Sequence, residues 1–168
     1  MLIRLEQEAD HQQIRIINSS AFETAAEANL VDVLRRSDIP LISLVAEEKD
    51  QLIGHILFSP VSLAGQTQSP PIAGLGPMAV LPAWQGQGVG SRLIREGLKY
   101  CTEAGYVAVV VLGHPDYYPR FGFVPTSTFN IKSEYEVPEE VFMLKELKPS
   151  ALTDIQGVIQ YHQAFNQV

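Results

Sequence analysis

Apolar and polar positions along the chain follow two different periods. Alternating or near-continuous apolar runs predict strands over residues 1–7, 41–46, 52–59, 72–81, 106–112 and 141–147, with a further strand within 155–161. Apolar residues spaced by three or four predict helices over residues 10–21, 23–36 and 88–104. The polar turn at 48–51 would join two strands in a hairpin, and Asp10 stands at the expected N-cap of the first helix.

The middle of the chain reads as a strand, a helix and a second strand. The run Tyr106–Leu112 is apolar almost throughout, as a strand buried on both faces requires. Two strands joined by such a helix pair in parallel through a right-handed crossover. Pro77 has no N–H to donate, so we expect the pairing of the earlier strand to be interrupted near it. The pattern therefore predicts a single α/β domain with a mixed sheet.

A glycine-dense loop precedes the helix expected at 88–104. Its glycines, Gly86, Gly88 and Gly90, lie between an apolar strand and that helix. Glycines let a ligand approach the backbone closely, and the amides of a first helical turn lack helical partners. The helix dipole also favours negative charge at this end. The loop therefore predicts a site for a phosphate or pyrophosphate group.

Spacing separates the families of phosphate-binding loops. A P-loop requires Gly-Lys followed by Ser or Thr, and no Gly-Lys pair occurs in this chain. The dinucleotide-binding pattern Gly-x-Gly-x-x-Gly fails at its third glycine, where Ser91 stands. A third pattern, Gln/Arg-x-x-Gly-x-Gly/Ala, matches residues 85–90 at every fixed position.

With this third pattern the chain resembles the GCN5-related N-acetyltransferase (GNAT) superfamily. The stretch Leu75–Pro82 is similar to the superfamily's fourth strand, and Tyr118–Phe123 is similar to its Tyr-x-x-x-Gly-Phe element. Together with Leu112–Pro115, these stretches resemble a bacterial subgroup of predicted acetyltransferases, over about residues 72–124. The resemblance implies one domain over residues 1–168. It also implies a mixed, mostly antiparallel sheet, with a splayed parallel pair of strands, flanked by helices.

The resemblance also implies a reaction. A member of the superfamily moves an acetyl group from acetyl-coenzyme A to an amine, by direct attack within a ternary complex. The implied cofactor-binding residues are Met78, Ala79, Val80, Gln85, Gly86, Gln87, Gly88, Val89, Gly90, Ser91 and Arg92. A backbone N–H within Met78–Val80 would stabilise the oxyanion, and Tyr118, four residues before Gly122, would protonate the departing thiolate.

The general base stays unassigned. Many members of the superfamily carry a glutamate on the fourth strand, but residues 73–81 contain no acidic residue. Glu23, Glu27, His114 and Asp116 are alternatives, and each also has an ordinary explanation as an exposed or turn residue. A water chain, or an amine that is already neutral, is a further alternative. A non-catalytic acyl-CoA-binding sensor or regulatory module is therefore the competing interpretation.

The composition of the chain disfavours several classes of binding partner. A net charge of −7 disfavours nucleic acid as a general partner. No apolar run reaches the length of a membrane span, and the N-terminus lacks a signal-peptide pattern, so we expect a cytoplasmic protein with no membrane partner. Cys101 lies on an apolar helix face and should be buried, and the histidines show no metal-ligand spacing, so we expect no metal. The expected acceptor is an amine-bearing small molecule or a protein or peptide.

Overall fold

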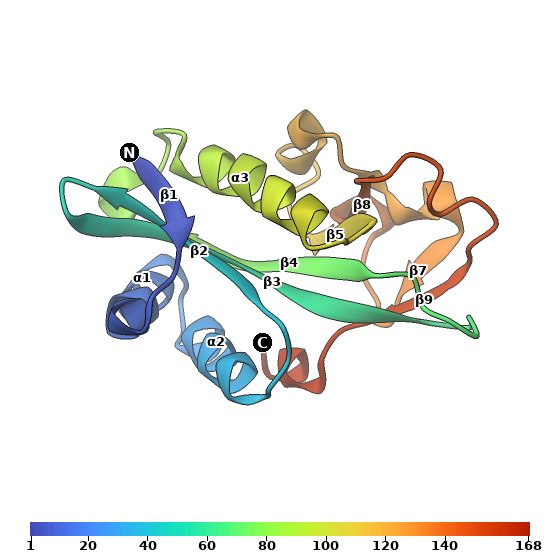
Figure 1. The fold of residues 1–168 in the computed structure, drawn as a ribbon, viewed down its shortest axis with the longest axis horizontal. Coiled ribbons are helices and arrows are strands. Elements are labelled where there is room, and N and C mark those ends of the chain that lie inside the picture. Colours follow the sequence, from blue (N-terminus) through green and yellow to red (C-terminus); the bar gives the residue numbers. More distant parts are fainter. The chain divides into compact units, whose positions relative to one another are not determined.

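The order of strands and helices is set out in Figure 1. The computed structural model describes all residues from Met1 to Val168. Its strands are β1 (Leu2–Leu5), β2 (Ile42–Glu48), β3 (Gln51–Ala64), β4 (Ile72–Val80), β5 (Ala108–Leu112), β6 (Val124–Pro125), β7 (Ile131–Ser133), β8 (Phe142–Glu146) and β9 (Gly157–Gln160). Its α-helices are α1 (His11–Ala21), α2 (Ala26–Arg36) and α3 (Val89–Glu103).

The chain divides into two compact units, each with its own hydrophobic core. Unit 1 comprises Met1–Ser59, Gly76–Lys99 and Gln163–Val168, and unit 2 comprises Pro60–Leu75 and Tyr100–His162. Strands β3 and β4 and helix α3 contribute residues to both units. The hydrogen-bonded strand order is β1-β2-β3-β4-β5-β8-β6, and β9 pairs with both β3 and β7.

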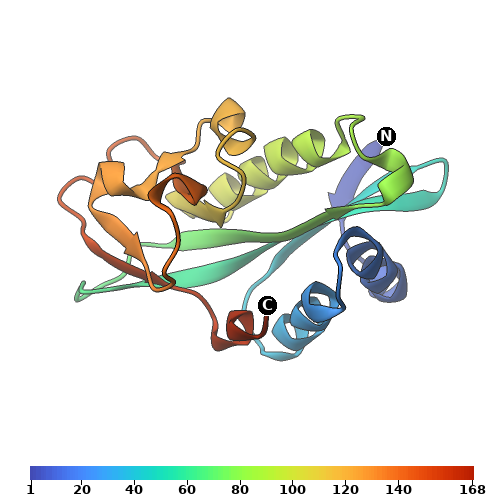
Figure 2. The ribbon, with the colours of Figure 1, turned by 180° about the vertical axis from the view of Figure 1, so that it is seen from behind.

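Unit 1 is a sheet with helices on both faces. Strands β1, β2 and β3 pair antiparallel. Figures 1 and 2 show α1 and α2 on one face of these strands and the first part of α3 on the other. Successive β3 residues agree with this, since Gly54 faces Leu93 of α3 whereas His55 faces Asn18 of α1. The core beneath α1 and α2 contains Ile14, Ile17, Leu30, Val31, Leu34, Val45, Leu52, Leu57 and Ala79.

Unit 2 contains two parallel pairs of strands, β4 with β5 and β7 with β9. Strand β4 pairs with β5 in parallel from Ile72 opposite Ala108 to Gly74 opposite Val110. Strand β5 continues to Leu112 in antiparallel pairing with β8, so its register with β4 ends two residues before its own end. The core contains Val61, Leu63, Ile72, Ala108, Val110, Ile131, Phe142, Leu144, Leu152 and Ile159.

The fold class expected from the sequence is confirmed. The sheet is mixed and mostly antiparallel, with β4 and β5 as parallel strands that connect through α3. The hairpin of β2 and β3 is also confirmed, and Lys49 and Asp50 make its turn with φ of 49° and 63°. Cys101 is buried as expected. No helix is both long enough and apolar enough to cross a membrane.

Some expected boundaries are wrong, each for a local reason. Helix α2 begins at Ala26 and not at residue 23, because the Ala26 N–H donates to Thr24 Oγ1 at 3.2 Å after a bent segment. Asp10 stands at the N-cap position of α1 as expected, but its side chain makes no capping hydrogen bond, since its carboxylate accepts the Gln7 N–H and an Arg4 N–H, both at 2.7 Å. Strands β6 and β7 were not expected, because runs of two and three residues carry no period.

Candidate functional site

The glycine-dense loop lies in unit 1, between the end of β4 and the start of α3. The Leu81 N–H donates to the Ile53 carbonyl at 2.9 Å, which fixes the end of β4 against β3. A single 3-10 turn, Pro82–Trp84, follows, and the Trp84 N–H donates to the Leu81 carbonyl at 2.8 Å. The loop therefore starts from a point that the sheet holds in place.

Two glycines give the loop its shape. Gly86 and Gly88 have φ of +76° and +84°, in the left-handed region that side chains other than Asn and Asp rarely adopt. A Cβ built on either residue would meet no heavy atom within 4 Å, so the space beside the backbone is open. This combination is what close approach of a ligand to backbone amides requires.

Two glutamine side chains fasten the loop to the residues that precede it. Gln85 Nε2 donates to the Val80 carbonyl at 3.0 Å, and Gln87 Nε2 donates to the Ala83 carbonyl at 3.1 Å. These hydrogen bonds tie the side chains back to β4 and to the 3-10 turn. The backbone is therefore positioned before any ligand arrives, which lowers the entropy lost on binding.

The first turn of α3 provides backbone N–H groups and the positive end of the helix dipole. The Arg92 N–H donates to the Gly88 carbonyl at 3.1 Å, so the amides of Val89, Gly90 and Ser91 precede the first helical hydrogen bond. Val89 is buried and anchors the helix, whereas Arg92 is exposed and donates through Nη1 to the Met1 carbonyl at 3.0 Å. The end of the helix is chemically suited to an anion.

Residues Met78, Ala79 and Val80 form the end of β4. Ala79 is buried in the core of unit 1, while Met78 and Val80 are half-buried. Residues 78–80 and 85–92, which include every residue expected to bind the cofactor, thus lie within one continuous stretch of unit 1, Gly76–Lys99.

Tyr118 lies in unit 2, in a cluster of aromatic rings. It opens the 3-10 turn Tyr118–Phe121, and its ring contacts those of Tyr117 and Phe123 edge to face at centroid distances of 5.2 and 5.7 Å. A Cβ on Gly113 would collide with the ring, so that glycine makes room for it. Burial, and then the neighbouring Tyr117, raises the pKa of Tyr118 to about 12. The phenol therefore stays protonated at neutral pH.

The four candidate bases lie in different surroundings. Glu23, His114 and Asp116 are exposed, and the His114 carbonyl accepts the N–H groups of Tyr117 and Tyr118 at 3.1 and 3.4 Å. Asp116 lies two residues before the 3-10 turn that starts at Tyr118. Glu27, in the first turn of α2, has one carboxylate oxygen buried.

A buried histidine in unit 1 is a feature that sequence spacing did not reveal. His55 on β3 is fully buried, with Nε2 at 2.9 Å from Ser43 Oγ and Nδ1 at 3.1 Å from Asn18 Nδ2. Burial lowers the pKa of His55 to about 4, against the raising effect of Glu6. The ring is therefore neutral, and because Asn18 Nδ2 is a donor, the ring proton belongs on Nε2 and points to Ser43. The apolar residues around His55 gave no sign of these partners.

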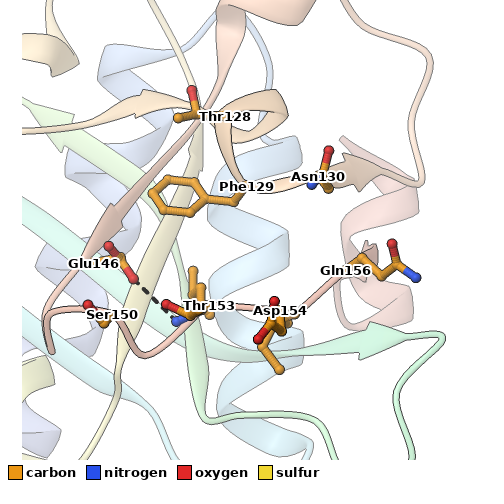
Figure 3. A pocket seen from close by; sticks show the side chains of 10 residues that line it. Thr128, Phe129, Asn130, Glu146, Ser150, Thr153, Asp154 and Gln156 are labelled. Atoms are coloured by element: carbon orange, nitrogen blue, oxygen red, sulfur yellow. Dashed lines mark hydrogen bonds between the residues drawn. The ribbon is translucent and has the colours of Figure 1, made fainter.

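A polar pocket of about 510 Å³ lies elsewhere in unit 2 (Figure 3). Its lining includes the carboxylates of Glu146 and Asp154, and Glu146 accepts the Leu152 N–H at 3.2 Å. Two carboxylates would repel a pyrophosphate. None of the residues expected from the sequence to form the site lines this pocket, so it is not the predicted cofactor site.

Comparisons with known proteins agree with this geometry. The model of the acetyltransferase (GNAT) family matches residues 5–123. N-acetyltransferase YhbS of Escherichia coli K12 is 37% identical over 168 residues, which cover 99% of each chain. The crystal structure of YhbS from Escherichia coli in complex with CoA has a TM-score of 0.93 at 37% identity and covers 98% of this chain and 91% of that one. The crystal structure of a GNAT family acetyltransferase from Brucella melitensis in complex with acetyl-CoA has a TM-score of 0.81 at 38% identity. The match covers 98% of this chain and 97% of that one.

Proposed function

Because the chain belongs to the acetyltransferase (GNAT) family, we propose that it transfers the acetyl group of acetyl-CoA to an amine by direct attack within a ternary complex. The observation that carries this proposal is the loop at 85–91, with left-handed Gly86 and Gly88 and with amides that precede the first hydrogen bond of α3. The complexes of similar proteins with CoA and acetyl-CoA support the same choice of co-substrate.

The loop residues would hold the co-substrate by its phosphates. Amides of Gly86–Ser91 donate to phosphate oxygens, and the positive end of α3 stabilises their charge. Ser91 and Arg92 lie in the first turn and would add side-chain contacts. Holding the acyl donor in this way raises the effective concentration of the thioester at the acceptor.

Two further groups would act on the reacting atoms. A backbone N–H within Met78–Val80 donates to the thioester oxygen as negative charge develops there, and such donors lower barriers by about 3 kcal/mol. The nitrogen of the neutral amine forms a bond to the carbonyl carbon, the carbon–sulfur bond breaks, and the Tyr118 hydroxyl gives its proton to the sulfur. The proton that the new amide nitrogen loses passes to water, and water returns a proton to the Tyr118 phenolate. The raised pKa of Tyr118 keeps that proton available at every pH at which the enzyme would work.

The proposal is tested by two measurements on the purified chain. Calorimetry with acetyl-CoA should give saturable binding at one site. Release of CoA, followed with a thiol reagent, should then accelerate on addition of primary amines, with the acetylated amine identified by mass spectrometry. Binding without transfer to any amine of a broad panel would instead favour the acyl-CoA sensor, which the absence of an acidic residue on β4 supports. Absence of binding by the folded protein would refute both.

A further inference from the structure

Glu27, in the first turn of α2, has an unusual environment for a carboxylate. Its Oε2 atom is buried and has no hydrogen-bond partner. A carboxylate oxygen removed from water without a donor costs free energy, because the hydrogen bonds that it makes in water are lost. Buried polar atoms without partners are rare in native proteins, and a catalytic role is one of the reasons for which they persist. What lies opposite Glu27 therefore decides what it can do.

The position of Glu27 on α2 turns its side chain toward the sheet. Residues 27, 30, 31 and 34 recur at intervals of three and four, so they share one face of the helix. The other three, Leu30, Val31 and Leu34, are buried in the core of unit 1. The same core contains Ala79 of β4, which lies within the stretch proposed to stabilise the oxyanion. Glu27 extends this face by one turn, toward the start of the helix.

Polar contacts fix the register between α1 and α2. Glu6, which follows β1, contacts His11 at the start of α1 at 2.7 Å and Arg35 near the end of α2 at 3.0 Å. Farther along, Arg15 of α1 donates to Asn29 of α2 at 2.8 Å. Figures 1 and 2 show the two helices side by side on one face of the sheet. The helices therefore run antiparallel from a common point beside β1.

This register carries the start of α2 across the sheet to β4. Asn18 of α1 contacts His55 of β3, so the helix from His11 to Asn18, about 10 Å long, crosses from β1 to β3. The helix from Arg35 back to Glu27 is about 12 Å long, which is between two and three strand spacings. Because the strand order is β1-β2-β3-β4, Glu27 lies over β3 and β4. The presence of a β4 residue in the core beneath α2 agrees with this position.

We propose that Glu27 is the general base of the acetyl transfer, and that Oε2 receives the proton that the attacking nitrogen loses on its way to water. Oε2 has a lone pair that no donor of the protein occupies, and it belongs to a helix face that packs on β4 where the thioester oxygen would be held. Helix α2 thus provides the acidic residue that residues 73–81 lack. This inference rests on the proposed acetyl transfer, since it assigns a residue to that reaction.

The proton transfers balance. As the amine nitrogen bonds to the carbonyl carbon it becomes positively charged, and its N–H gives a proton to the Glu27 carboxylate. The carbon–sulfur bond breaks with its electron pair on the sulfur, which takes the proton of the Tyr118 hydroxyl. Glu27 then gives its proton to water, and water returns a proton to the Tyr118 phenolate. Both side chains are thereby restored, and the products are the amide and CoA.

The test compares the full-length parent with Glu27→Gln, Glu27→Ala and the control Glu8→Gln. The acceptors are n-butylamine and benzylamine, and CoA release is followed with a thiol reagent. Glu27→Gln is isosteric and should lower kcat about 10²-fold, because general bases contribute about 10²- to 10⁴-fold. Its calorimetric affinity for acetyl-CoA should equal that of the parent. Glu8→Gln removes an equal charge from an exposed residue of unit 1 and should leave kcat unchanged.

Chemical rescue distinguishes a base from a residue that only supports the fold. Glu27→Ala leaves space for a small carboxylate, so sodium formate should raise its kcat saturably, by about tenfold, whereas sodium chloride at the same ionic strength should not. The thermal unfolding midpoint of Glu27→Gln should not fall below that of the parent, because the change removes a charged oxygen that is buried without a partner.

The outcomes separate this inference from the proposed function. If the parent acetylates either amine but Glu27→Gln keeps the kcat of the parent, or formate fails to raise the kcat of Glu27→Ala, the base role is overturned and the proposed function stands. If the parent acetylates neither of these amines nor any other of the panel, the proposed function fails and the base role fails with it. A loss of kcat at unchanged acetyl-CoA affinity, reversed by formate, supports both.

Discussion

The charge preference of the loop can be isolated at Gly88 with a matched pair of variants, Gly88→Asp and Gly88→Asn. Gly88 has φ of +84°, and a Cβ there meets nothing within 4 Å, so both side chains have room. Asn and Asp are the residues other than glycine that best tolerate this conformation, and they are nearly identical in size. Backbone strain and steric effects therefore cancel in the comparison, and the difference between the variants is one negative charge.

The size of the effect follows from Coulomb's law. Gly88 is exposed, so the dielectric constant of water applies. A carboxylate about 5 Å from a pyrophosphate with two charges then costs about 1.7 kcal/mol without screening. With a Debye length of about 8 Å at physiological salt, the cost falls to about 0.9 kcal/mol, or roughly fivefold in affinity. At about 10 mM salt the Debye length is about 30 Å, and the difference rises to roughly tenfold.

Calorimetric titration with acetyl-CoA at both salt concentrations measures this difference. S-acetylpantetheine, which has the thioester arm but no phosphates, is the control ligand, and both variants should bind it equally. Matching thermal unfolding midpoints for the two variants would show that both are folded alike. Equal affinities of Gly88→Asp and Gly88→Asn for acetyl-CoA at low salt would refute the assignment of phosphate binding to this loop.

Three other changes test the reasoning. Tyr118→Phe should lower the turnover of acetyl transfer by about 10²-fold and leave the calorimetric affinity for acetyl-CoA unchanged, whereas unaltered turnover would remove this phenol from the mechanism. The folded-state pKa of His55, about 4, lies below its unfolded value of about 6.5, so the free energy of unfolding should fall by about 2 kcal/mol from pH 7 to pH 5. Urea unfolding at several pH values should show that the free energy of unfolding of His55→Gln depends less steeply on pH, and an unchanged pH dependence would assign that dependence to other groups. Gly97→Ala should destabilise the protein by about 1–3 kcal/mol despite its better helix propensity, because its Cβ would collide with the buried Phe58 ring; thermal unfolding measures this, and a rise in midpoint would contradict it.

The sequence alone determined the strand, loop and helix of the middle of the chain. The apolar run that becomes β5, the glycines at 86–90 and the amphipathic α3 are local patterns, and each has one physical interpretation that does not depend on distant residues. The parallel pairing of β4 and β5 followed from their connection through a helix. The place of these residues at the end of β4, in the loop and in the first turn of α3 was therefore readable from the local pattern. Their role in cofactor binding came from the family resemblance and stays a prediction.

Tertiary structure decided what depends on partners far apart in the chain. The neutral state of His55 comes from Ser43 and Asn18, which face it from another strand and a helix. The meeting of Tyr135 with Tyr161 comes from the pairing of β7 with β9. The sequence predicted a strand within 155–161, where β9 lies, but the three residues of β7 carry no period and the partner of β9 was not predicted. The spacing of apolar residues predicts only whether a side chain is buried, because the hydrophobic effect is non-directional. Which polar group meets another is fixed by strand register and helix packing, and these form only when the whole chain folds.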